Sequence, residues 1–230
     1  HYQKMIDKEQ YQNKIKKAPY KLTYQTKNHR GVYSFCMCPG GYVINSASEN
    51  NSLVVNGMSN YLRDSNTANS AIVVTVSKKD YGEGLFAGVK YQQELEKKAY
   101  LKGNGKIPVE YYQDFLNKKI TKKETDFAIL GAYTFTDLND ILPVTISDSI
   151  KEAMIEFNKK IKNFSDSNPL LAGVETRTSS PIKIIRDEKL ESNIKGIYPC
   201  GEGSGYAGGI TSSAIDGIKV AEEIIKKYYY

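Results

Sequence analysis

The residues best suited to chemistry lie near the end of the chain, where glycines crowd a short segment. Residues 201–209 read Gly-Glu-Gly-Ser-Gly-Tyr-Ala-Gly-Gly, so five of nine are glycine. A loop of this composition exposes main-chain N–H groups, and a helix that follows it adds the positive end of its dipole. Together these groups can stabilise an anionic oxygen, such as that of a phosphate.

One carboxylate falls inside this loop. Glu202 can accept hydrogen bonds from the hydroxyls of a sugar alcohol, each contributing about 1.5–3 kcal/mol when the acceptor is charged. Gly208, Gly209 and Ile210 can present N–H groups at the start of a helix, and a planar ring can approach glycine backbone closely. These features suit a reduced flavin, which has an anionic N1–C2=O edge and a polyol arm. The loop could instead hold a phosphate, or be a tight turn without a ligand.

Residues 203–208 also match the dinucleotide pattern G-x-G-x-x-G. That fingerprint requires a second strand after the helix, ending in an acid about 20 residues on that binds the ribose. Here the expected helix runs to the end of the chain. We therefore do not interpret this segment as the fingerprint of a Rossmann βαβ unit.

Three further residues are weak candidates for catalysis. Arg177 could bind a substrate carboxylate or a nicotinamide phosphate, although an ion pair with Glu175 or Asp187 explains it equally well. Cys36 and Cys38 could form a redox pair beside a flavin. A C-x-C disulfide closes a small and strained ring, so structural cysteines are favoured. No metal site is expected, because the chain has only two histidines and lacks the usual ligand spacing.

Composition narrows the class of protein. The formal net charge is +6, but only four of the 32 basic residues are arginine, the residue that best reads bases and phosphates. We therefore expect the lysines on solvated helix faces, and we expect no nucleic-acid partner. No apolar run approaches the roughly 18 residues that cross a bilayer, and three cysteines make no disulfide framework. We expect a cytoplasmic protein without a membrane partner. Because the chain begins with His1, we expect a piece of a longer protein.

The patterns predict an α/β or α+β fold, with a mixed sheet and an inserted helical subdomain. We expect four regions: a weakly patterned segment at 1–30, a β-rich substrate-side region at 31–84, a helical subdomain at 85–170, and return strands with the glycine loop at 171–230.

Within the β-rich region, strands are expected at 32–37, 42–44 and 53–55. Residues 71–76 are apolar on both faces and predict an interior strand. The expected helical segments are one from Leu85 that stops at Gly103, one that begins at Pro108, and one that begins with a capping box of Ser149 and Glu152.

Two strands are expected near the end of the chain, at 182–185 and 197–198. The second would feed the glycine loop directly. The helix after the loop carries one apolar stripe at a spacing of four and three; its members are Ala214, Ile218, Ala221, Ile225 and Tyr228.

The segment 201–210 resembles the C-terminal flavin motif of FAD-dependent dehydrogenases of the glutathione-reductase type. It is most similar to a poorly characterised bacterial group of FAD-dependent dehydrogenases. The stretches that support this resemblance are Arg30–Asn45, Val55–Ser59, Asn69–Ala71 and Gly173–Pro181.

The resemblance implies an FAD/NAD(P)-binding-type fold. It implies that Glu202 meets the ribityl chain of FAD, and that Gly208, Gly209 and Ile210 lie near the flavin pyrimidine edge or the diphosphate. Gly201, Gly203 and Gly205 complete the implied cofactor loop. The N-terminal βαβ unit that binds the adenosine part of FAD does not occur in these residues, so the missing N-terminal half of the same protein is the expected partner.

We therefore expect a fragment of an FAD-dependent oxidoreductase that moves hydride through the flavin, with NAD(P)H or an organic small molecule exchanging electrons. The fragment alone is expected to be inactive and to be isolated without FAD. The alternative is a non-catalytic binding module, in which the glycine loop holds a phosphate or only shapes the backbone.

Overall fold

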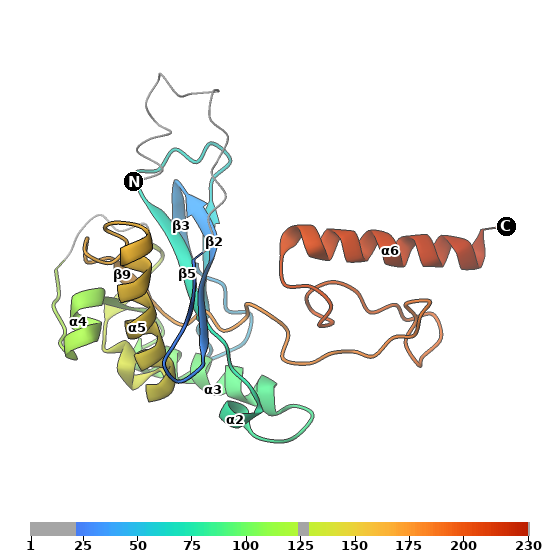
Figure 1. Cartoon of the computed structure of the whole chain (residues 1–230), viewed down its shortest axis with the longest axis horizontal. Helices are drawn as coiled ribbons and strands as arrows, with labels where there is room; N and C mark the ends of the chain where they lie inside the picture. The colour runs from blue at the N-terminus through green and yellow to red at the C-terminus, as the bar shows by residue number, and fades with distance from the viewer. Residues whose placement is uncertain (1–21, 124–128, 230) are drawn as a thin grey trace. The chain divides into compact units, whose positions relative to one another are not determined.

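The computed structural model describes residues 22–123 and 129–229. These residues form a mixed α/β fold, which confirms the predicted fold class. The chain divides into two compact units (Figure 1). Unit 1 comprises the chain up to Thr75 and Glu94–Thr176, and unit 2 comprises Val76–Gln93 and Arg177–Tyr230. The four-region organisation expected from the sequence stays a prediction.

Unit 1 contains three small sheets of three strands each, counted over the described residues. The first is antiparallel and pairs β1 (Thr23–Gln25), β2 (Gly31–Pro39) and β5 (Ala68–Val74) in that order. The second has the order β4 (Val55–Ser59), β3 (Gly41–Asn45), β7 (Ile129–Leu130). The third has the order β8 (Tyr133–Phe135), β6 (Ile107–Tyr111), β9 (Leu170–Ala172).

The strands β2 and β3 form where the sequence predicts them, but they do not pair with each other. Gly40, with φ +54°, turns the chain between them, and each strand joins a different sheet. The strand expected at 53–55 is wrong apart from Val55, because Leu53 and Val54 are buried in a connection rather than in a sheet. The interior strand expected at 71–76 is also wrong: β5 lies at an edge and pairs only with β2 among the described strands.

The described residues form five α-helices and one 3-10 helix. Helix α2 (Lys78–Tyr81) begins with a capping box of Ser77 and Asp80, and α3 (Ala87–Lys102) stops before Gly103 as predicted. The remaining helices are α4 (Tyr112–Asn117), the 3-10 helix η2 (Leu138–Asp140), α5 (Val144–Lys160) and α6 (Ile210–Tyr228).

Two of the expected helix starts are wrong. Pro108 lies inside β6, where it is buried, and the helix begins only at Tyr112. Ser149 lies in the interior of α5, which begins after Pro143, and its hydroxyl donates to the carbonyl of Thr145 at 2.6 Å. The spacing of Ser149 and Glu152 therefore resembles a capping box without being one, because residues 144–148 are already helical.

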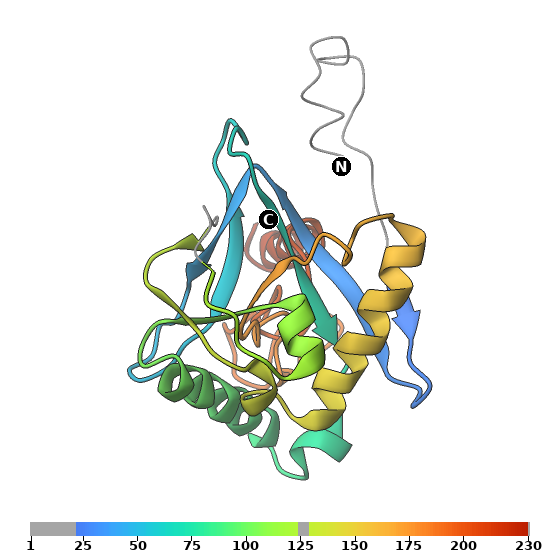
Figure 2. The same ribbon diagram turned by 90° about the vertical axis from the view of Figure 1, so that its left-hand side faces the viewer.

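The core of unit 1 forms where α4, α5 and the strand β6 meet. Helix α5 packs on the strands of the first sheet, and Figure 2 shows it crossing them. Phe157 of α5 is fully buried and meets the ring of Phe164 edge-on at 5.8 Å. Burying such aromatic surface is the main source of stability for a unit of this size. Other fully buried side chains are Ile107, Val109, Tyr112, Phe115, Ile141 and Met154.

In unit 2 the two expected return strands do not form. Residues 182–185 and 197–198 belong to no sheet, and the described residues there make only an isolated bridge between Arg186 and Ser192. Instead, Ile184 donates its N–H to the carbonyl of Ser204 at 3.1 Å. The segment 182–185 therefore contacts the glycine loop through a single main-chain hydrogen bond and is not part of a β-sheet.

A buried carboxyl group ties β6 to η2. Glu110 is 1% exposed, and its Oε2 accepts the N–H of Leu138 at 2.9 Å. Its Oε1 has no hydrogen-bond partner in the described structure. Burial raises the pKa of Glu110 to about 7, against the opposing effects of the Leu138 N–H and of Lys151. The folded protein therefore holds a proton that an unfolded chain releases near pH 4.5.

This proton makes stability depend on pH. Between pH 4.5 and 7 the folded state binds more protons than the unfolded state, so the free energy of unfolding falls as pH rises, by up to roughly 3 kcal/mol. We expect Glu110→Gln to remove this fall, because an amide does not ionise. Urea unfolding of both proteins at pH 5 and pH 8 measures it. Equal pH dependence in the two proteins would contradict the assignment.

Candidate functional site

The glycine loop folds into consecutive tight turns ahead of α6. Gly205 donates its N–H to the carbonyl of Glu202 at 2.9 Å, and Tyr206 donates to the carbonyl of Gly201 at 3.1 Å. Gly201 and Gly205 have φ of +71° and +83°, a region that side chains disfavour. Ser204 is buried, and its hydroxyl donates to the same Gly201 carbonyl at 3.2 Å. These contacts within the loop define its shape.

The glycines of the loop serve two different purposes. A Cβ on Gly205 would lie 2.5 Å from the carbonyl oxygen of Ile182, so the backbones pack too closely there for any side chain. A Cβ on Gly203 or Gly208 would meet no atom within 4 Å, so these positions leave main chain open. Open glycine backbone is what a flat cofactor needs for close approach.

The N-terminus of α6 is free of side-chain caps. Gly209 is the N-cap residue, no side chain bonds the first N–H groups, and the first turn contains no acid. Ser212 does not cap the helix, because its hydroxyl donates to the carbonyl of Gly209 at 3.0 Å. Ile210 is 92% exposed. The positive end of a 19-residue helix thus lies beside the open glycines.

Glu202, the acid predicted to contact the polyol arm, is half-buried in the loop. Within the described residues its carboxylate has no ion pair or hydrogen bond, so its oxygens can accept hydroxyl donors. The loop thus combines main-chain donors with one uncommitted acceptor. These residues fit the polar edge and the polyol arm of a flavin nucleotide.

An arginine that the sequence analysis did not select holds the loop on α6. The guanidinium of Arg186 donates to both carboxylate oxygens of Asp216, at 2.7 and 2.9 Å, and to the carbonyl of Pro199 at 2.8 Å. Its planar group also lies 3.6 Å from the centre of the Tyr206 ring. Asp216 in turn accepts the N–H of Gly201 at 2.9 Å. One ion pair therefore contacts the residues before, within and after the loop.

This ion pair is largely removed from water, since the two side chains are 9% and 11% exposed. Hydrogen bonds from Arg186, and then from the Gly201 N–H, lower the pKa of Asp216 to about 2. A bidentate guanidinium–carboxylate pair of this kind fixes geometry as well as charge. The pair therefore sets where the glycine loop lies relative to its helix.

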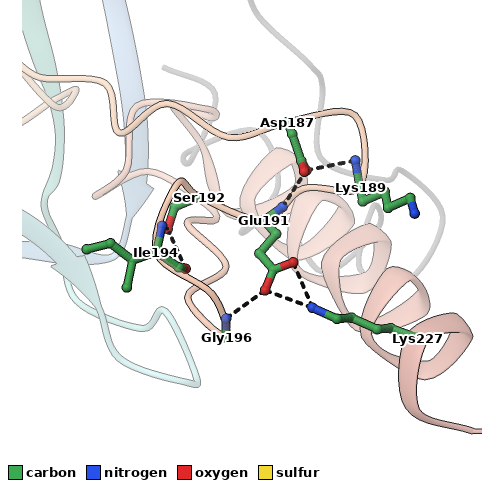
Figure 3. A network of polar contacts seen from close by, with 7 residues as sticks. All are labelled: Asp187, Lys189, Glu191, Ser192, Ile194, Gly196 and Lys227. Atoms are coloured by element: carbon green, nitrogen blue, oxygen red, sulfur yellow. Dashed lines mark hydrogen bonds and ion pairs between the residues drawn. The ribbon is translucent and has the colours of Figure 1, made fainter.

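A second polar network fixes the segment that leads into the loop (Figure 3). Lys227 near the end of α6 contacts both oxygens of Glu191, at 2.7 and 2.8 Å. Glu191 also accepts the N–H of Gly196 at 2.6 Å. Asp187 closes the preceding turn by accepting the N–H groups of Lys189 and Glu191, each at 2.9 Å. Asp216 and Lys227, about three turns apart on α6, thus each hold a different part of the loop region.

The weak catalytic candidates belong to two different units. Cys36 is exposed, with φ +50°, at an irregularity in the pairing of β2 and β5, and Cys38 is half-buried. The Cys38 Sγ lies 3.6 Å from the carbonyl oxygen of Cys36, and burial raises the pKa of its thiol. None of Cys36, Cys38 and Cys200 forms a disulfide in the described structure. Arg177 belongs to unit 2, where its side chain is half-buried and has at least one interaction partner. Their catalytic roles stay predictions.

No three His, Cys, Asp or Glu side chains at 22–123 or 129–229 come together as metal ligands. In the same ranges no helix has both the length and the apolar character needed to cross a membrane.

The Arg186–Asp216 pair can be tested by substitution. Asp216→Asn keeps an acceptor for the Gly201 N–H but leaves a buried guanidinium without a counter-charge, so we expect unit 2 to lose about 3–5 kcal/mol of local stability. Amide hydrogen exchange of Gly201 measures the loss. Glu223→Gln, on the same helix, breaks the more exposed pair with Lys226 and should change protection by less than about 1 kcal/mol.

Acid should have the same effect as the substitution. Because the pKa of Asp216 is lower in the folded protein than its ordinary 3.8, its stabilising contribution is complete above pH 4 and is lost as pH falls towards 2. Gly201 protection that is unchanged by Asp216→Asn at neutral pH would contradict the role of this pair.

Comparison with known proteins assigns the chain to a family. Residues 1–178 match the family described as FAD-dependent protein, C-terminal domain-like. An uncharacterized protein of Clostridium beijerinckii is 46% identical over 240 residues, which cover 99% of this chain and 45% of that protein. The chain thus spans less than half the length of this relative. Residues 179–230, which carry the glycine loop, lie outside the family match. On the match over residues 1–178, the chain belongs to the family of FAD-dependent proteins that have this C-terminal domain.

Proposed function

We propose that these 230 residues are part of a longer FAD-dependent oxidoreductase, a dehydrogenase in which hydride passes through the flavin. Membership of an FAD-dependent family supports a flavoprotein role. The observation that carries the proposal for this chain is the open main chain at Gly203 and Gly208 next to the uncapped start of α6. When bound, FAD would accept a pair of electrons with a proton from one substrate and return them to another.

Different residues of the loop would contact different parts of the cofactor. The N–H groups at Gly208, Gly209 and Ile210 would stabilise an anionic edge of the flavin or its diphosphate, helped by the dipole of α6. Glu202 would accept hydroxyl hydrogens of the ribityl arm. Gly201 and Gly205 would hold the loop in shape, since both have positive φ. Arg186 and Asp216 would act as positioning residues for this loop.

The proposal also covers substrate binding and the two cysteines of β2. Arg177 is the candidate for binding an anionic substrate or the phosphate of NAD(P)H, which we propose as the electron donor. Cys38 suits a structural role better than a redox role, because burial raises the pKa of its thiol and so disfavours the reactive thiolate. Cys36 remains the more accessible of the two thiols. The substrate is proposed only as an organic small molecule.

The proposal requires a partner segment that binds the adenosine part of FAD. The relative from Clostridium beijerinckii has more than twice the length of this chain, which leaves room for such a segment in the whole protein. We therefore propose the N-terminal part of the full-length protein as the partner. The 230-residue chain alone would then bind FAD weakly.

The experiment is flavin binding by the purified full-length protein. We expect a flavin absorbance band in the wild type. We expect Gly208→Val to bind FAD at least about tenfold more weakly, because a loss of about 1.4 kcal/mol in binding free energy, from a lost contact or a steric clash, lowers the affinity tenfold. Gly217→Val is the matched control, since a Cβ at Gly217 also meets no atom within 4 Å but lies in the middle of α6. Titration of the apoprotein with FAD, followed by flavin fluorescence, measures both.

Two results would contradict the proposal. A colourless full-length protein that does not bind added FAD would contradict the proposal that the protein is a flavoprotein. Equal affinity of the Gly208→Val and Gly217→Val proteins would remove the glycine loop from the binding site. If phosphate or pyrophosphate binds the loop and FAD does not, the loop is a general anion site.

A further inference from the structure

Lys183 packs against the middle of the glycine loop. A Cβ on Gly205 would lie 3.0 Å from the Cα of Lys183 and 3.2 Å from its Cβ, so only a glycine at position 205 lets the two segments approach this closely. The next residue, Ile184, donates its N–H to the carbonyl of Ser204 at 3.1 Å. All four residues belong to unit 2. These contacts fix the point on the loop from which the lysine side chain extends.

The charged end of this side chain lies over the aromatic ring of the loop. The Nζ of Lys183 lies 4.5 Å from the centre of the Tyr206 ring, and the guanidinium carbon of Arg186 lies 3.6 Å from the same centre. The face of an aromatic ring attracts a cation, but the ring does not neutralise the charge. Tyr206 precedes Gly208 by two residues, so the ammonium lies on the same loop as the open main chain.

The two cations on Tyr206 differ in their counter-charges. Arg186 is neutralised by Asp216, whose carboxylate oxygens it bonds at 2.7 and 2.9 Å. Among the described residues of unit 2, the ammonium of Lys183 has no ion pair and no hydrogen bond beside its contact with Tyr206. A lysine that is held by a ring and not by a carboxylate keeps its three N–H donors for an anionic ligand.

The sign of this charge agrees with the main-chain groups at the end of the loop. The N–H groups at Gly208, Gly209 and Ile210 lie at the positive end of α6, whose first turn contains no acid. An ammonium and a helix N-terminus attract the same kind of group, an oxygen that carries negative charge. A flavin nucleotide has such oxygens in two places, the diphosphate and the N1–C2=O edge of the reduced ring.

We propose that Lys183 is a further cofactor-binding residue, whose ammonium pairs with an anionic oxygen of the flavin nucleotide at the glycine loop. The inference rests on the proposed function for the identity of the ligand, and it adds a full positive charge to the main-chain donors of that site. Packing against Gly205 and contact with Tyr206 restrict the lysine side chain, so less conformational entropy is lost when it pairs with the ligand.

Removal of the charge at position 183 tests the inference in the full-length protein. Lys183→Gln keeps a side chain of similar length without the charge, and Lys183→Arg keeps the charge. Lys189→Gln is the matched control, because Lys189 is an exposed lysine of the same loop segment. Titration of each apoprotein with FAD, followed by flavin fluorescence, measures the dissociation constant. A redox titration measures the midpoint potential of the bound flavin.

The two kinds of anionic oxygen predict different results for Lys183→Gln. A diphosphate partner predicts at least about tenfold weaker binding of FAD, because a charge-assisted hydrogen bond is lost, and unchanged binding of riboflavin, which has no phosphate. A partner at the ring edge predicts a midpoint potential about 30 mV more negative, which corresponds to tenfold weaker binding of the two-electron-reduced flavin. In either case we expect Lys183→Arg to recover most of the loss and Lys189→Gln to stay within about twofold of the wild type.

Two outcomes would overturn the inference. Lys183→Gln could match Lys189→Gln in both FAD affinity and midpoint potential, which would mean that the ammonium contacts no anionic part of the cofactor. Equal losses in Lys183→Gln and Lys183→Arg would mean that the shape of the side chain matters and its charge does not.

These outcomes are separate from those of the proposed function. A wild-type full-length protein that binds no FAD would contradict the proposed function, and calorimetric titration with inorganic pyrophosphate then tests Lys183 by itself. Pyrophosphate binding that weakens about tenfold in Lys183→Gln would support the lysine as an anion-binding residue. Undetectable or unchanged pyrophosphate binding would overturn that role as well.

Discussion

The buried pair of Arg186 and Asp216 is the constraint on which unit 2 depends. Residues 177–209 contain no helix or strand, so no hydrogen-bonded ladder holds them in place. Instead a single guanidinium bonds Pro199 and Asp216 and stacks on Tyr206, while Asp216 also accepts the Gly201 N–H. Burying two charges is favourable only when the geometry and the remaining hydrogen bonds are good. Here the carboxylate and the guanidinium satisfy each other, and the result is a loop with a fixed shape.

A loop held in this way can leave part of its backbone uncovered. Tight packing is confined to Gly205, where the backbone of Ile182 approaches, while Gly203 and Gly208 remain open. The start of α6 adds uncapped N–H groups beside them. A backbone that is held in one shape loses less conformational entropy when it binds a ligand.

The sequence predicted local features well and long-range ones poorly. The glycine loop and α6 were predictable because a dense glycine run and a 3.6-residue period are local signals. Pro108 was placed in a helix because its neighbours have helical spacing, yet sheet pairing of β6 with two strands decides its conformation. The Arg186–Asp216 pair was missed because its partners are 30 residues apart. The sequence offers no local signal for the pair, because α6 also carries acids that are exposed, such as Glu222.

Amide hydrogen exchange across residues 201–210 of the full-length protein, with and without FAD, tests the central claim most directly. If these main-chain groups contact the cofactor, exchange at Gly208, Gly209 and Ile210 slows when FAD binds, because donors bonded to a ligand exchange only after it leaves. Saturating FAD that slows exchange elsewhere in the protein and leaves these three amides unchanged would contradict the account.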